Sequence, residues 1–149
     1  MSPRQFWNSF RWQFAQGLGI VHLPWCRAAA ILLAIALLIS LLAQRPFAQG
    51  RWRSYYWLLL TQLLFHPAAI AIGALYARDQ FPSGPVPPID PIANGSLYGI
   101  FYLSLALGAF WIYRLEDFRW FAFCFVALAE VFLMGALLVA SMSVTGDWI

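Results

Sequence analysis

The chain has 149 residues, of which 62% are hydrophobic and only 10% are charged, and its formal net charge is +3. A soluble domain carries about a quarter charged residues, so this composition excludes an ordinary water-soluble fold. All nine basic residues are arginines scattered beside apolar stretches. That distribution favours anchoring to a lipid bilayer, and we expect no nucleic-acid partner.

Residues 1–27 predict an interfacial amphipathic segment. Ser2 and Pro3 form a cap and first-turn pair. Aromatic side chains then recur at helical spacing, opposite polar ones: Phe6, Trp7, Phe10 and Phe14 against Arg4, Asn8 and Arg11. A helix of this kind lies in the membrane plane. Tryptophan and arginine suit the headgroup zone, so the expected interfacial anchors are Trp7, Arg11, Trp12, Trp52 and Arg53.

Residues 28–149 are expected to form one domain of four transmembrane helices. A helix rises about 1.5 Å per residue and the hydrocarbon core is roughly 30 Å thick. Apolar stretches suited to this thickness lie at about 28–44, 54–77, 97–113 and 120–144. The loop 78–96 holds five of the nine prolines and divides the domain into two hairpins. The predicted fold is therefore an all-α integral membrane four-helix bundle with an N-terminal interfacial helix.

Two of the predicted spans carry small and polar residues on one face. In the second span, Gln62, His66 and Gly73 are separated by four and seven residues and share a helical face. In the third, Ser104 and Gly108 form a small-xxx-small pair, which lets another helix approach closely. We predict helix packing at Ser104, Gly108 and Gly73.

Glu130 lies near the middle of the stretch 120–144. A charged residue at the centre of a membrane helix costs on the order of 3 kcal/mol, so Glu130 should be protonated, partnered or facing a wet cavity. Gln62 and His66 lie at similar depth, and we predict that one of them hydrogen-bonds Glu130. Such a contact could be a polar clamp that fixes helix register, or a proton or ion site.

No sequence motif predicts a catalytic residue, because the chain has no H-E-x-x-H, no G-x-S-x-G and no glycine-rich phosphate loop. Cys26 and Cys124 lack the spacing of a metal or disulfide site, and we expect no metal. Haem ligation through His66 or His22 would require the two histidines at similar depth on facing helices. We therefore predict no cofactor, and an enzyme is not expected.

These observations favour a small, multi-pass, non-catalytic membrane protein. The expected role is a structural or assembly subunit that packs with other membrane chains or with copies of itself. The alternative is an oligomeric channel or proton-coupled carrier that uses Glu130 and His66. We expect the bacterial cytoplasmic membrane as its location. The orientation stays open, because either topology leaves five arginines on one side against four on the other.

Overall fold

The computed structural model of the chain describes residues 2–44, 52–77 and 90–146. This part of the chain is all-helical, as predicted, and contains no strand. Its α-helices are α1 (Pro3–Leu18), α2 (Pro24–Gln44), α3 (Trp52–Leu75), α4 (Pro91–Arg114) and α5 (Arg119–Thr145). Two short 3-10 turns join neighbouring helices: η1 (Gly19–His22) precedes α2, and η3 (Glu116–Phe118) precedes α5.

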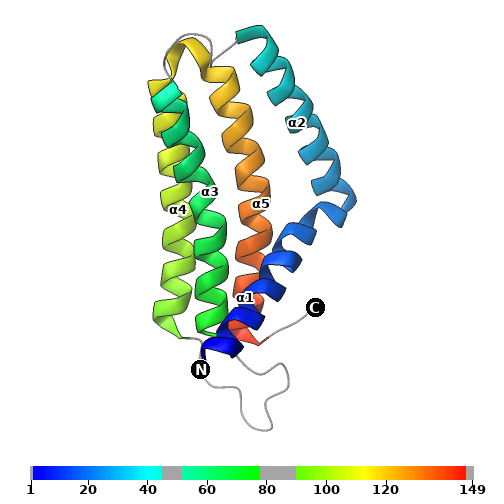
Figure 1. Ribbon diagram of the computed structural model, residues 1–149, viewed down its shortest axis with the longest axis vertical. Helices are drawn as coiled ribbons and strands as arrows, with labels where there is room; N and C mark the ends of the chain where they lie inside the picture. Colours follow the sequence, from blue (N-terminus) through cyan, green and yellow to red (C-terminus); the bar gives the residue numbers. More distant parts are fainter. Residues whose placement is uncertain (1, 45–51, 78–89, 147–149) are drawn as a thin grey trace.

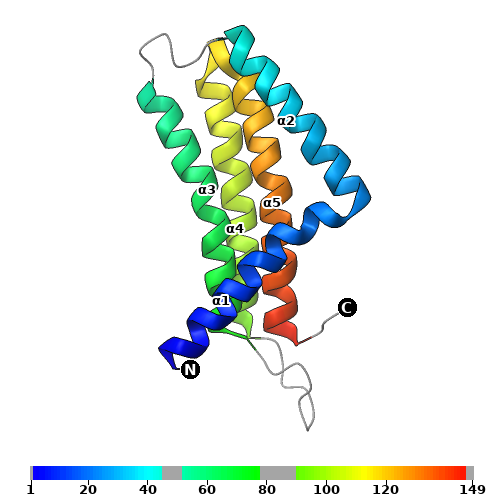
Figure 2. The ribbon, with the colours of Figure 1, turned by 45° about the vertical axis from the view of Figure 1, so that its right-hand side comes forward.

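Helices α2 to α5 are long and apolar enough to cross a membrane, judged by length and composition. This finding indicates a multi-pass membrane protein. Helices α3, α4 and α5 pack against one another, and α2 packs against α5 (Figure 1). Helix α1 crosses the bundle obliquely and contacts α3 and α5 (Figure 2). Helix α5 is therefore the central element, in contact with all four of the other α-helices.

The core consists of two apolar clusters at opposite ends of the bundle. The lower cluster in Figure 1 contains Ala69, Ile70, Ala93, Leu97, Leu133, Ala136, Ala140 and Val144. The upper cluster, beside η3, contains Tyr55, Leu58, Leu115, Phe118, Phe121, Ala122 and Val126. Helix α2 contributes little to either, since Ala30 is the one buried residue among 24–43.

Helix α4 begins earlier than the sequence predicted, and α2 extends the predicted span 28–44 at its N-terminal end, where the short span left room for an extension. Helix α2 begins at Pro24 instead of residue 28, and α4 at Pro91 instead of residue 97. Residues 91–96 were therefore wrongly assigned to the proline-rich loop, of which 78–89 lie outside the described residues. Proline is tolerated in the first helical turn. At α4, Asp90 Oδ1 accepts hydrogen bonds from the backbone N–H groups of Ile92 and Ala93, at 2.8 and 3.3 Å.

Helix α1 has the predicted amphipathic pattern, but its inner face contacts protein. Phe10 and Phe14 pack against the lower cluster, and Gln13 and Gly17 are buried. The sequence pattern of a hydrophobic helix face is the same whether lipid or other helices cover that face. The prediction of a helix lying in the membrane plane therefore missed that α1 closes one side of the bundle. A capping box between Ser2 and Gln5 begins the helix.

Removing the cap of α4 should destabilise the protein. Replacing Asp90→Ala leaves two backbone donors without their acceptor and should lower the free energy of unfolding by about 1 kcal/mol. Asp90→Asn keeps a capping oxygen and is the matched control. Its loss of unfolding free energy should be only a few tenths of the loss in Asp90→Ala. Reversible unfolding in mixed micelles measures both, and equal losses would contradict the capping role.

Candidate functional site

Three polar side chains meet in the middle of the bundle, between the two apolar clusters. They are Gln62 of α3, Ser104 of α4 and Glu130 of α5, and we call them the polar junction. Ser104 is fully buried and Gln62 is 4% exposed, whereas Glu130 is partly buried. Apolar residues lie above and below on the same helices, so the junction is a narrow polar layer in an apolar core.

Two hydrogen bonds connect the three helices of the junction. The hydroxyl Oγ of Ser104 donates to Glu130 Oε1. The side-chain Nε2 of Gln62 donates to the backbone carbonyl oxygen of Ser104 at 3.4 Å. Glu130 Oε2 is buried without a hydrogen-bond partner in the described part of the chain. Ser104 thus bonds to both α3 and α5, and a second bond, from Trp111 Nε1 to Thr61 Oγ1 at 3.0 Å, also joins α4 to α3.

The predicted direct bond from Gln62 or His66 to Glu130 is wrong. The amide of Gln62 reaches the backbone of α4, and the hydroxyl of Ser104 reaches the carboxyl group instead. His66 packs edge-on against Phe14 of α1, with ring centroids 5.0 Å apart. Its Nε2 is buried without a hydrogen-bond partner among the described residues. His66 therefore lies where α3 meets both α1 and α5, because its imidazole also lies against the backbone of Phe132.

Gly108 lies one turn beyond Ser104, where α4 approaches α5 closely. A Cβ atom at this position would come within 2.6 Å of Val126 Cγ1 and 3.5 Å of Gln62 Nε2. A side chain here would push α5 away from α4, and Ser104 could then no longer reach Glu130. The Ser104 and Gly108 pair thus provides one hydrogen bond and one close approach.

Gly73 and Gly17 have the same role where α1 joins the bundle. A Cβ on Gly73 would lie 2.7 Å from Ala140 Cα and 2.5 Å from the side-chain oxygen of Gln13. A Cβ on Gly17 would lie 3.2 Å from the Cα of Ala136. Gln13 Nε2 donates to Ser9 Oγ at 2.9 Å. Small residues therefore bring three helices together at this end of the bundle.

The sequence contained a signal for the Ser104 partner that the prediction did not use. Ser104 and Glu130 are 26 residues apart, so their midpoint is residue 117, within the η3 turn that joins α4 to α5. In an antiparallel hairpin, residues equidistant from the turn lie at the same depth. Gln13 carried no comparable signal, because a glutamine on an amphipathic helix normally faces water.

The other predicted site residues lie outside the junction. Trp7 and Arg11 are exposed on α1 and Trp12 is 43% exposed, while the side chains of Trp52 and Arg53 lie outside the described residues. His22 is exposed in η1. Among the described residues, no three histidine, cysteine or acidic side chains are grouped so that they could hold a metal ion.

The junction can hold or share a proton, but its geometry lacks the parts of a nucleophilic site. The Ser104 hydroxyl is bonded to a carboxyl group, and no imidazole contacts it in the described structure. Comparison of the chain with protein-family models, curated proteins and solved structures finds no match. The functional argument therefore depends on the chemistry and packing of these residues alone.

A double-mutant cycle tests the corrected contact. Ser104→Ala and Glu130→Leu should show a coupling of about 1 kcal/mol in the free energy of unfolding, because each removes the partner of the other. His66→Leu and Glu130→Leu should show a clearly smaller coupling, because no hydrogen bond joins these side chains. Coupling in the second cycle with additivity in the first would contradict the assignment.

Proposed function

We propose that the protein is a small integral membrane protein, expected in the bacterial cytoplasmic membrane, that acts as a non-catalytic structural or assembly subunit. It would pack with other membrane chains or with copies of itself. The observation that carries this proposal is the outer face of α4. Small residues and tyrosines follow one another there at alternating spacings of four and three residues: Gly95, Gly99, Tyr102, Ala106, Ala109 and Tyr113. We call this stripe the outer face of α4.

All six residues of the outer face of α4 are exposed, and Tyr102 and Tyr113 are 65% and 71% exposed. A spacing of four and three residues is the pattern by which helices pack along a seam. In a bilayer, lipid is as apolar as leucine, so helices associate where small residues let backbones approach. The outer face of α4 meets this requirement along most of its length.

The two glycines supply the strongest part of the argument. Glycine within a helix costs about 1 kcal/mol relative to alanine. Gly73 and Gly108 offset that cost by allowing close helix contacts inside the bundle. Around Gly95 and Gly99 there is no atom within 4 Å of a Cβ, so internal packing does not account for them. A partner helix packed on this face would account for both glycines.

Bulky side chains on the outer face of α4 should prevent assembly. The double substitution Gly95→Leu and Gly99→Leu keeps the helix and blocks close approach, so the association constant in lipid nanodiscs should fall at least tenfold, or about 1.4 kcal/mol. Native mass spectrometry of complexes isolated from the host membrane measures the assembled fraction.

Ala34→Leu is the matched control, because Ala34 is a small exposed residue on α2. It should leave assembly unchanged. A wild-type chain that is monomeric in its own membrane, or a double variant that assembles like wild type, would contradict the proposed role.

A proton-coupled carrier or oligomeric channel is a second candidate. It is favoured by Glu130 Oε2 and His66 Nε2, which are buried and have no hydrogen-bond partner within the described residues. Intramembrane ionisable groups are often proton relays. The carboxyl group of Glu130 is bonded to Ser104, and the imidazole of His66 packs on Phe14 and lies against the backbone of Phe132, so no hydrogen bond joins the two groups. The lack of a direct bond between them favours the structural role for the polar junction.

The substitution Glu130→Gln separates the two candidates. In proteoliposomes carrying a pH gradient, a structural role predicts no difference in proton flux between wild type and Glu130→Gln. A carrier or channel predicts flux through the wild-type protein that Glu130→Gln abolishes while assembly is unchanged. The latter result would overturn the non-catalytic, structural assignment.

A further inference from the structure

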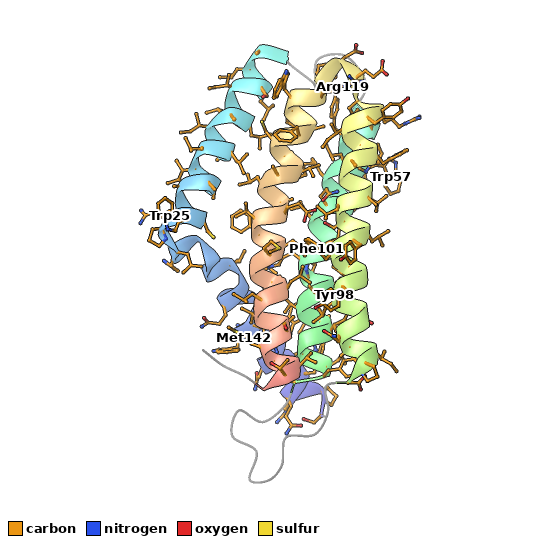
Figure 3. All side chains as sticks on the ribbon, turned by 180° about the vertical axis from the view of Figure 1, so that it is seen from behind. Trp25, Trp57, Tyr98, Phe101, Arg119 and Met142 are labelled. Carbon is orange, nitrogen blue, oxygen red and sulfur yellow. The ribbon has the colours of Figure 1, made fainter. Side chains whose placement is uncertain are left out.

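A cleft of about 300 Å³ lies between α4 and α5, on the flank of α4 next to its outer face. Its lining is apolar and aromatic over most of its surface, with Leu97 and Phe101 from α4 and Met134 and Leu137 from α5. Figure 3 shows Phe101 and Tyr98 on the side of α4 that borders α5. Pockets for small ligands begin at about this volume and have this mainly apolar lining.

The polar groups of the cleft are confined to one end. Asn94 lies in the first turn of α4 and Ser141 lies one turn from the end of α5, and these ends are adjacent because the two helices are antiparallel. Both side chains are exposed, and neither is hydrogen-bonded to another side chain or to the backbone of the described residues. Donors and acceptors are therefore available at the mouth, with an apolar interior beyond it.

The length of the cleft favours one lipid chain over a partner helix. From Asn94 to Phe101 the helix rises about 10 Å, which is roughly a third of the hydrocarbon thickness and lies within one leaflet. A transmembrane partner helix would need a groove through both leaflets. A lipid needs a polar mouth at the membrane surface and an apolar slot pointing toward the bilayer centre, which is the arrangement present here.

The charges near the cleft favour a neutral head group. None of the described lining residues is charged. The carboxylate of Asp90, one turn before Asn94 and outside the lining, caps α4. No cation among the described lining residues is available to bind an anionic head group.

We propose that this cleft binds one acyl chain of an uncharged glycerolipid, with Asn94 and Ser141 hydrogen-bonding its hydroxyl or carbonyl groups. Leu97, Phe101, Met134 and Leu137 contact the chain. Methionine suits this place because its unbranched side chain adapts to irregular space. The inference rests on the proposed membrane location, which resistance of the protein to alkaline extraction tests separately. The proposed assembly rests on a different, neighbouring set of residues, the outer face of α4.

Photolabelling tests the site directly. The full chain is reconstituted in phosphatidylcholine nanodiscs with a monoacylglycerol that carries a diazirine in its acyl chain, and labelled peptides are mapped by mass spectrometry. Labelling should concentrate on 97–101 and 134–138. Met134→Trp fills the cleft and should reduce this labelling at least fivefold. Leu138→Trp is a second filling variant, and Leu103→Trp, which is exposed on α4 outside the lining, should have no effect.

Head-group selectivity is tested by competition and by removing the polar mouth. Unlabelled monoacylglycerol should displace the probe, and anionic lysophosphatidylglycerol should displace it at least fivefold less well. The double variant Asn94→Ala and Ser141→Ala should weaken this preference with the fold intact. The proposal is overturned by even labelling of all lipid-facing helices, by equal competition from the anionic lipid, or by a photoreactive residue at Leu138 that captures a second copy of the chain.

Discussion

The fold depends on one geometric constraint: a single helix, α5, must contact each of the other four α-helices. In a bilayer the hydrophobic effect does not press helices together, so close packing and hydrogen bonds have to do so. Three of these four helices approach α5 at a glycine. Gly17 lies against Ala136, Gly73 against Ala140 and Gly108 against Val126. The positions of these glycines therefore determine where α1, α3 and α4 can lie.

The polar junction is the second consequence of this arrangement. Gly108 brings α4 close enough to α5 for the short side chain of Ser104 to reach Glu130, and Gln62 then joins α3 to the same point. Apolar clusters on either side limit the hydrogen-bonding alternatives available to the carboxyl group. A mismatch in register between α4 and α5 would leave Glu130 without its partner, which is energetically costly. The junction therefore favours one register of α4 against α5.

Periodicity and length predicted the helices, because an apolar stretch long enough to cross the bilayer can satisfy its backbone hydrogen bonds in few structures other than a helix. They did not predict where α4 begins, since the Asp90 cap and Pro91 lie inside a proline-rich segment that reads as a loop. They also placed Glu130 with His66, because both are ionisable and lie at mid-depth. Which polar groups meet depends on helix rotation and neighbour order, and neither follows from one sequence. For the same reason, the sequence did not predict that α1 packs against the bundle.

The central claim is that Glu130 faces Ser104, and solid-state NMR in lipid bilayers tests it most directly. Among the residues of this chain, only Glu116 and Glu130 are glutamates and only His22 and His66 are histidines, so selective carbon-13 labelling gives few signals to assign. A cross-peak between Glu130 Cδ and a serine Cβ that disappears in Ser104→Ala is the result expected here. A cross-peak from Glu130 Cδ to the His66 ring, with none to serine, would contradict the account.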